Sequence, residues 1–391
     1  MRKSIKIAIY TGSVPSTTFI ERLIQGLAKN GLQIYLFGFQ NRKITSISKT
    51  HYVTHSNRLS KFFILFKYSL LLRLFKSIEK RKLDKIIHNK GKNIKNLKVK
   101  YYPVLYHRPD IFHLQWAKGI EDWIWVKEFD IKLIVSLRGA HINYSPIADS
   151  NLANKYKTLF PKVDGFHAVS NAIAKESMKY NAFENRIKVI YSGLDLNQII
   201  FHSKAFDSKT PLNIISVGRE HWKKGYAYAL DSMKFLKNEG IDFHYTIIGV
   251  AQDEELLYKR SILGLENEVT FIEKLPFEEV MKSIRLADIL LLPSIEEGIA
   301  NVVIEAMALG TLVVSTNCGG MGEVIEDKVN GYLMPIRDAS AMVSALKHVS
   351  ELSLESYQTI TDEARKTIEK QHSHKTMISD MQDLYEKVLN F

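Results

Sequence analysis

The chain has 391 residues, 46% of them apolar, and its 54 basic and 42 acidic residues give a formal net charge of +12. This length suggests about two domains, and the apolar share is ample for two hydrophobic cores. No apolar run reaches the ~18 residues of a membrane-spanning helix. The only cysteine, Cys318, excludes an intrachain disulfide and fits a reducing cytoplasm.

The first 200 residues alternate predicted strands and helices, which indicates a parallel sheet. Strands are predicted over residues 6–10, 34–37, 110–114, 133–137 and 165–169. A loop over 11–18 follows the first strand, and a helix with apolar residues at helical spacing follows that loop. The loop lacks G-x-G-x-x-G, so a dinucleotide cofactor is not supported. Gly12 in this loop either lets a ligand approach the backbone or makes a turn.

The whole basic excess lies in one segment, residues 58–100, which holds 14 basic residues and two acids, Glu79 and Asp84. A helix is predicted over 62–78, and we expect its aromatic residues to lie in the core because they recur at helical spacing. Three interpretations remain open for the charge: a solvated helix face, an anionic membrane surface as partner, or a nucleic-acid-binding α/β protein.

A second alternation follows a polar stretch over 201–211, the predicted linker. Strands are predicted over 214–217, 245–248, 269–272, 289–292 and 312–314, and helices over 226–238 and 375–389. In a βαβ unit the loops after both strands lie on one edge of the sheet, where a helix N-terminus can bind phosphate. The sequence therefore predicts a binding edge for a phosphorylated ligand near residues 296–301.

From Glu297 the chain reads E-G-x6-E, A-x-A-x-G, V-V and G-G-x-x-E in order, and from Gly218 it reads G-R-x4-K-G. These two motifs resemble those of retaining glycosyltransferase family 4, whose members have the GT-B fold. The resemblance implies two Rossmann-like parallel-sheet domains facing across a cleft. We expect an acceptor domain over 1–200, a nucleotide-sugar domain over 212–374, and a C-terminal helix over 375–391 that packs back toward the first domain.

The resemblance also implies a reaction: transfer of a hexosyl group, with retention, from a nucleotide-diphosphate sugar to a glycan or lipid-linked glycan in bacterial-type surface polysaccharide synthesis. Arg219 and Lys224 would stabilise the departing diphosphate, and Glu297 would lie near the donor sugar. Glu305 would bind the ribose hydroxyls. The remaining donor contacts are expected at Gly12, Gly218, Gly298, Ile299, Ala300 and Asn301. Eight helical residues span ~12 Å, so the two glutamates are not the closely spaced pair of a retaining glycosidase.

The acceptor half departs from the family. Many members have His-Gly at the end of the strand that here reads V-S-L-R-G-A-H, and Arg138 occupies the histidine position. Arg138 cannot act as a base because guanidinium stays protonated, so we expect it to orient an acceptor or bind its anionic substituents. His141 and His113 are further acceptor candidates, with a core position as the alternative for His113.

Two expectations concern what the site lacks. The chain has no D-x-D pair and no histidines at ligand spacing, so no metal and no cofactor are expected. A non-catalytic nucleotide-sugar-binding protein remains an alternative to the enzyme, and turnover would distinguish the two. The donor motif argues against nucleic-acid binding, which needs none of its residues.

Overall fold

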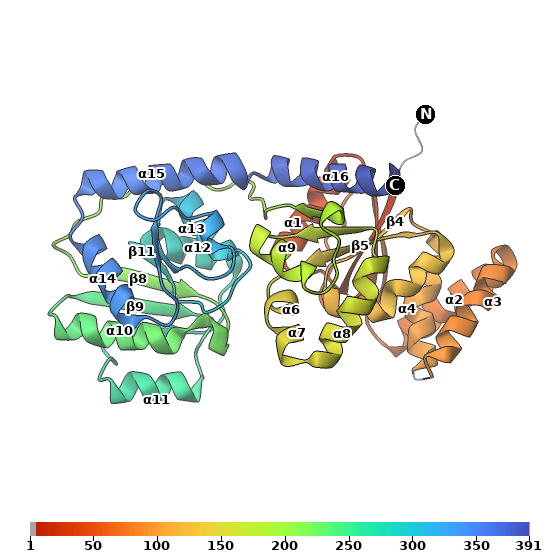
Figure 1. Cartoon of the computed structure of the whole chain (residues 1–391), viewed down its shortest axis with the longest axis horizontal. Coiled ribbons are helices and arrows are strands. Elements are labelled where there is room, and N and C mark those ends of the chain that lie inside the picture. Colours follow the sequence, from red (N-terminus) through yellow and green to blue (C-terminus); the bar gives the residue numbers. More distant parts are fainter. Residues whose placement is uncertain (1–4, 92, 391) are drawn as a thin grey trace. The chain divides into compact units, whose positions relative to one another are not determined.

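The computed structural model describes residues 5–91 and 93–390, so Lys92 of the basic segment lies outside the described residues. The chain divides into two compact units (Figure 1). The N-terminal unit comprises the chain up to Val169, Ile173–Gly193 and the last helix, α16 (His374–Asn390); the C-terminal unit comprises Ser170–Ala172 and Leu194–Ser373. The main division thus falls earlier than the predicted linker, and residues 201–211 belong to the C-terminal unit.

The N-terminal unit is built on a seven-stranded parallel sheet with the order β3-β2-β1-β4-β5-β6-β7. Its strands are β1 (Lys6–Val14), β2 (Gln33–Gln40), β3 (Thr50–His55), β4 (Ile111–Leu114), β5 (Lys132–Leu137), β6 (Gly165–Ala168) and β7 (Ile187–Val189). Its helices are α1 (Thr18–Lys29), α2 (Arg58–Phe75), α3 (Ser77–Asn89), α4 (Ile94–His107), α5 (Ile120–Trp123), α6 (Ala140–Asn143), α7 (Ser145–Ala148), α8 (Ser150–Leu159), α9 (Asn171–Met178) and α16. The strand order reverses direction between β1 and β4, which makes this pair the topological switch point of the sheet.

The C-terminal unit has a six-stranded parallel sheet with the order β10-β9-β8-β11-β12-β13. Its strands are β8 (Leu212–Val217), β9 (Phe243–Ile248), β10 (Val269–Ile272), β11 (Ile289–Leu292), β12 (Leu312–Thr316) and β13 (Tyr332–Met334). Its helices are α10 (Tyr226–Asn238), α11 (Glu254–Ile262), α12 (Phe277–Leu286), α13 (Asn301–Leu309), α14 (Ala339–Ser350) and α15 (Leu354–Gln371).

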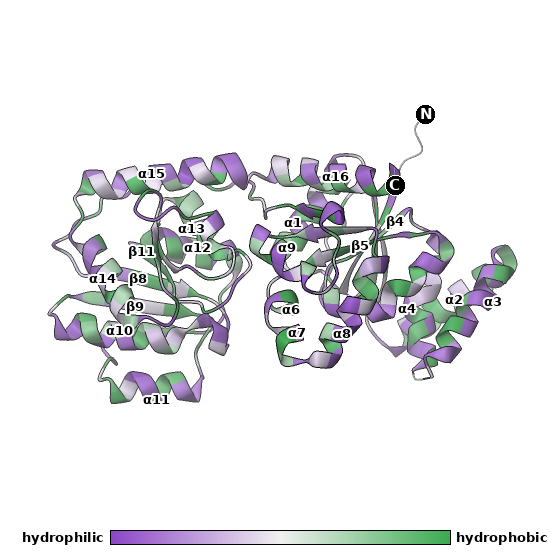
Figure 2. Cartoon of the chain, in the orientation of Figure 1, coloured by the Kyte–Doolittle hydropathy of each residue, from purple (hydrophilic) through white to green (hydrophobic). Residues whose placement is uncertain are grey.

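Helices cover both faces of each sheet. Successive residues of a strand point to opposite faces, so the apolar residues of one strand pack against helices on both sides. In β11, Ile289 and Leu291 pack in a core with α10 and α14, whereas Leu290 and Leu292 pack in a second core with α12, α13 and α15. The N-terminal sheet is arranged in the same way, with α1 and α16 on one face and α4 on the other. Figure 2 shows the hydropathy of these elements. The expected fold class, two Rossmann-like parallel-sheet domains, is confirmed.

Helix α2 differs from the sequence expectation in what it buries. Only Tyr68 and Leu72 are fully buried there, and Phe62, Phe63 and Phe66 are exposed. The prediction that the aromatic residues of this segment lie in the core is therefore wrong for all but Tyr68. The helix is apolar on nearly every side, so periodicity could not show which side faces the protein.

Candidate active site

The Glu297 carboxylate is the centre of a polar cluster at the carboxyl edge of the C-terminal sheet. Glu297 lies in the loop between β11 and α13 and is nearly buried. Its Oε1 accepts from Lys224 Nζ at 2.7 Å and from Ser294 Oγ at 3.3 Å, and its Oε2 accepts from Lys223 Nζ at 3.2 Å. Burial alone would raise the pKa of Glu297, but Lys224 and Lys223 outweigh it and hold that pKa below its usual value. The Glu297 carboxylate is therefore ionised at neutral pH.

Lys223 is a member of this cluster that sequence reasoning missed. Its side chain is buried, and its Nζ also donates to the Glu296 carbonyl at 3.3 Å. A short 3-10 turn over Trp222–Lys224 brings both lysines to one carboxylate. The only signal in the sequence was the pair of adjacent lysines, because the family motif covers Lys224 alone.

Arg219 lies in the same loop but is free to meet a ligand. It follows β8 and Gly218, is exposed, and forms no ion pair with a described residue. Gly218 has to be small, because a Cβ there would come within 2.8 Å of the Tyr226 hydroxyl and 2.9 Å of Lys224 Cε. The loop thus places one exposed guanidinium beside two ammonium groups that are already held in position.

The start of α13 offers unsatisfied backbone donors at this edge. Its N-cap residue, Ala300, has no side chain that can accept from the first-turn N–H groups. Asn301 Oδ1 is buried and has no hydrogen-bond partner among the described residues, so it can accept from a ligand hydroxyl. Glu305 is nearly buried within the same helix. Free amides and the positive end of the helix dipole together suit a phosphate.

The loops after β11 and β12 are joined at their glycines. Gly320 N–H donates to the Gly298 carbonyl at 2.7 Å, and Gly319 has a positive φ of 54° against the backbone of Glu297. Side chains at these glycines would collide with the loop that carries Glu297. Glu323, just beyond, accepts from the backbone N–H groups of Asn171 at 2.8 Å and Ala172 at 2.9 Å, which belong to the same unit.

A second cluster lies in the N-terminal unit, at the carboxyl ends of the neighbouring strands β4 and β5. Arg138 donates to Gln115 Oε1 at 3.0 Å and lies 4.7 Å from the ring centroid of Phe19. No described carboxylate pairs with it, and burial lowers the pKa of Arg138 to about 9, so it remains charged at neutral pH. Arg138 Nε and Gln115 Nε2 are buried donors without a partner among the described residues. The sequence did not single out Gln115.

The other acceptor candidates have different surroundings. His141 lies on α6, with its ring centroid 5.3 Å from that of Trp116. Burial, and to a lesser extent the charge of nearby Lys118, lowers the pKa of His141 to about 4, so its ring is neutral at pH 7. His113 is fully buried and bonded at both ring nitrogens, to the Tyr385 hydroxyl and to Ser136 Oγ, each at 2.8 Å. His113 therefore has no free nitrogen for an acceptor, and the core alternative is the one the structure supports.

Gly12 lies within β1, which is four residues longer than predicted and so includes residues 11–14 of the predicted loop. Its φ is 88°, the pairing of β1 with β2 shifts register there, and a Cβ would meet nothing within 4 Å. Open space beside a left-handed backbone is compatible with either alternative given for Gly12.

Among the described residues, no group of three His, Cys, Asp or Glu side chains is placed to hold a metal ion.

Comparison with solved structures identifies the fold. The chain matches sucrose-phosphate synthase of Thermosynechococcus elongatus with a TM-score of 0.74 at 16% identity, over 99% of both chains. It matches Anabaena Alr3699/HepE in complex with UDP-glucose with a TM-score of 0.70 at 16% identity, over 99% of this chain and all of that one. At these identities the likeness shows the fold alone, which is GT-B.

Two family models then assign the family. "Glycosyltransferase Family 4" matches residues 16–198, and "Glycosyl transferases group 1" matches residues 198–367. The chain belongs to glycosyltransferase family 4.

Two curated relatives match over part of their length. The putative colanic acid biosynthesis glycosyltransferase WcaL of Escherichia coli K12 is 32% identical over 225 residues, 55% of this chain and 54% of the relative. The amylovoran biosynthesis glycosyltransferase AmsK of Erwinia amylovora is 33% identical over 229 residues, 56% of this chain and 55% of the relative. The matched region thus spans about half the length of these relatives.

Proposed function

We propose that the protein is a retaining hexosyltransferase that uses a nucleotide-diphosphate sugar, without a metal, to extend a glycan or lipid-linked glycan in surface polysaccharide synthesis. The observation that carries the proposal is the Glu297–Lys223–Lys224 cluster beside the uncapped start of α13. The names of the relatives, colanic acid and amylovoran biosynthesis, support the polysaccharide, and the UDP-glucose complex of HepE supports the donor.

The leaving group explains why three cations are gathered here. When the bond between C1 and the diphosphate breaks, negative charge grows on the diphosphate oxygens. Lys224 is already fixed by its 2.7 Å contact with Glu297, so little reorganisation is needed as that charge develops. Arg219 supplies a planar fork of donors for the same oxygens. The acceptor oxygen bonds to C1 on the same face, and its proton passes to the departing phosphate.

The donor is bound by groups with different tasks. Free N–H groups at the start of α13, from Ile299 to Asn301, bind a phosphate, and Asn301 Oδ1 accepts from a sugar hydroxyl. The Glu305 carboxylate takes the two ribose hydroxyls. Glu297 stays ionised between two lysines and lies toward the donor sugar.

The acceptor carries an anionic group that Arg138 binds. A charged guanidinium held among neutral groups is costly, and a phosphate or carboxylate would offset that cost with charge-assisted hydrogen bonds. Gln115 Nε2 is a second donor at the same strand ends. These groups lie at the carboxyl edge of the N-terminal sheet near its switch point, where ligands of α/β proteins bind. The protein works at an anionic membrane surface, where a lipid-linked acceptor is found.

The proposal is tested first by binding and then by turnover. Nucleotide sugars are screened for protection of the chain against thermal unfolding, and a ligand at 100 times its Kd adds about 2.7 kcal/mol. Glu305→Gln should lose most of this protection, and Glu296→Gln, outside the motif, should keep it. Transfer to a lipid-linked glycan is then followed by NMR of the new anomeric centre.

Two outcomes would contradict the proposal. An inverted anomeric centre would overturn retention. Protection without any turnover across acceptors would favour the non-catalytic nucleotide-sugar-binding protein.

A further inference from the structure

Helix α2 presents a row of large apolar side chains to solvent. Six of them recur at helical spacing and form one face that we name the α2 face: Leu59, Phe62, Phe63, Phe66, Leu70 and Leu74. Their exposed fractions run from 46% to 71%, and the neighbouring Phe75 and Ile78 are exposed as well. A contiguous exposed apolar patch of this kind marks an interaction site, whereas scattered exposed residues need no explanation.

The aromatic residues of this face contact one another. The rings of Phe62 and Phe66 stack with centroids 6.4 Å apart, and Phe62 meets Phe63 edge-on at 6.1 Å. The opposite side of the helix already supplies the protein with its packing, through buried Tyr68 and Leu72 and partly buried Leu65. The α2 face is therefore not needed to attach the helix to its own unit.

The charges around this face identify its partner. Helix α2 contains four basic residues and no acid. Lys67 and Arg73 are exposed at the two borders of the face, and neither forms an ion pair with a described residue. An apolar strip bordered by unpaired cations fits the surface of a bilayer, with phenylalanines at the acyl boundary and cations at lipid phosphates.

The helix is built to lie on a membrane and not to cross it. Eighteen residues extend ~27 Å, and one side of α2 is already buried in the protein. No helix in the described part of the chain is long and apolar enough to span a bilayer.

We propose that the α2 face inserts into the interfacial layer of an anionic bilayer, with Lys67 and Arg73 at the headgroups. This inference deepens the proposed membrane-surface location by assigning it to apolar insertion and not to charge alone.

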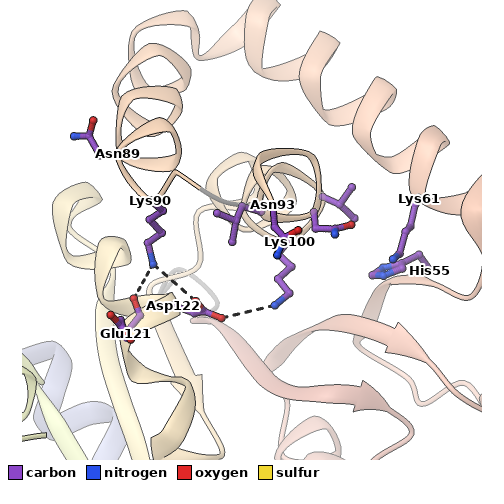
Figure 3. Close-up of a pocket in the computed structure, with 11 residues that line it drawn as sticks. His55, Lys61, Asn89, Lys90, Asn93, Lys100, Glu121 and Asp122 are labelled. Atoms are coloured by element: carbon purple, nitrogen blue, oxygen red, sulfur yellow. Dashed lines mark hydrogen bonds and ion pairs between the residues drawn. The ribbon is translucent and has the colours of Figure 1, made fainter. Parts of the chain in front are cut away.

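Five other lysines of the basic segment contribute less, because acids of the protein already engage them: Lys80, Lys82, Lys90, Lys98 and Lys100. A cavity of about 760 Å³ beside α2 shows this (Figure 3). Lys90 Nζ lies 3.9 Å from the Asp122 carboxylate, and Lys100 Nζ lies 3.7 Å from it. On α3, Lys80 pairs with Asp84 at 2.7 Å. The electrostatic attraction of residues 58–100 to an anionic membrane is therefore not spread evenly along the segment.

The test is co-sedimentation of the full chain with vesicles of phosphatidylcholine and roughly one third phosphatidylglycerol. The wild-type chain should bind, and part of the binding should persist at high salt because apolar burial is not screened. Phe62→Ser, Phe63→Ser and Phe66→Ser combined should lower the partition coefficient at least ~100-fold at every salt concentration. Lys67→Gln with Arg73→Gln should lose only the low-salt increment. Phe235→Ser, an exposed phenylalanine on α10, is the matched control and should bind as wild type.

A second readout reports insertion directly. Cys318 is buried, so a cysteine introduced as Phe66→Cys can be labelled selectively with an environment-sensitive dye. Its emission should shift to the blue on vesicles, and that of Phe235→Cys should not. Melting temperatures of the triple-serine variant should match wild type, because the replaced side chains are exposed.

Two results would overturn the inference. One is wild-type vesicle binding by the triple-serine variant, which would leave charge as the cause. The other is a wild-type chain that does not bind vesicles but is a dimer by light scattering, with a triple-serine variant that is a monomer. That result would assign the α2 face to a second copy of the chain. Nucleotide-sugar protection of the triple-serine variant is measured separately, so a failure here leaves the donor proposal standing.

Discussion

Glu297, Lys223 and Lys224 show how a single carboxylate organises the C-terminal site. Without the carboxylate, two neighbouring ammonium groups would repel each other in a poorly solvated loop. With it, both are fixed, whereas Arg219 is exposed and forms no ion pair with a described residue. We infer a division of roles in which Lys224 is preset for the diphosphate and Arg219 closes on it.

Arg219→Ala and Lys224→Ala are each expected to slow turnover about 100- to 1,000-fold, the loss seen when one donor to a developing anion is removed. The effect should fall on kcat more than on KM, since the charge grows as the bond breaks. Steady-state kinetics with the preferred donor measure both constants. Lys234→Ala, a lysine on α10 away from the loop, should leave them unchanged. A wild-type kcat in either site variant would remove that residue from the leaving-group site.

Arg138→Met is expected to keep or raise the melting temperature while weakening use of an anionic acceptor about 10- to 100-fold. Methionine can still pack on Phe19, and no buried cation remains uncompensated. Arg138→Lys, which keeps the charge without the planar fork, should fall between. Thermal unfolding and the acceptor KM are the measurements. Strong destabilisation, or equal losses with neutral and anionic acceptors, would make Arg138 a structural residue.

Sequence reasoning located the residues whose spacing forms a motif and missed those that only folding brings together. Glu297, Lys224 and Glu305 could be named because the motif fixes their register. Lys223 and Gln115 could not, since each acts through a turn or a neighbouring strand whose geometry the sequence does not reveal. His113 was left between two alternatives because strand periodicity does not show which buried histidines find partners on other elements, such as Tyr385 on α16.

At the scale of elements, the uncapped start of α13 is a feature that a single substitution can test. Ala300 already has the extended backbone of an N-cap, with φ −75° and ψ 118°. Ala300→Ser should stabilise the fold by about 0.5–2 kcal/mol by capping the helix. The same hydroxyl would stand at the helix N-terminus, beside the N–H groups of Ile299 to Asn301 that bind the phosphate, so donor affinity should fall.

Thermal unfolding with and without the nucleotide sugar measures both effects of Ala300→Ser. The comparison variant is Asp338→Ala, which removes the side-chain cap of α14, where Asp338 accepts from Ala341 N–H at 2.9 Å. It should lose stability and retain donor affinity. If Ala300→Ser were stabilised and bound donor as wild type does, the phosphate would not lie at these amides.

The helices and strands that could be predicted are those whose residues form a continuous apolar run or a regular helical pattern. The bounds of β10, β11 and α10 match the predictions, since each is an apolar run or a regular helical pattern between clear turn residues. Strand β3, whose residues T-H-Y-V-T-H are half-buried at the sheet edge, gave no such signal. Helix α2 was predicted as a helix, but two of its sides are equally apolar. Only the packing of one side against the rest of the unit distinguishes the buried side from the exposed one.

For the whole molecule, the proposed chemistry uses the protein's own cations in place of a metal. Transfer activity should therefore survive EDTA, because Arg219, Lys223 and Lys224 supply the positive charge beside the diphosphate. The control is a metal-dependent transferase assayed in the same buffer, which must lose activity. Loss of activity restored by magnesium would show that the donor site has been misassigned.

The position of α16 has a consequence for the order in which the protein acquires its structure. Met381 and Leu384 of α16 are buried in the core that Ile20 and Leu23 of α1 share, and Gly26 lacks a side chain where Ile378 packs. The N-terminal unit therefore cannot complete its core until residues 374–390 have been synthesised, whereas residues 194–373 form a nearly continuous unit. Because continuous domains fold during synthesis, the half made second can fold first. Until then the apolar side of α1 remains exposed, so we expect the nascent chain to need chaperones until residues 374–390 have been synthesised.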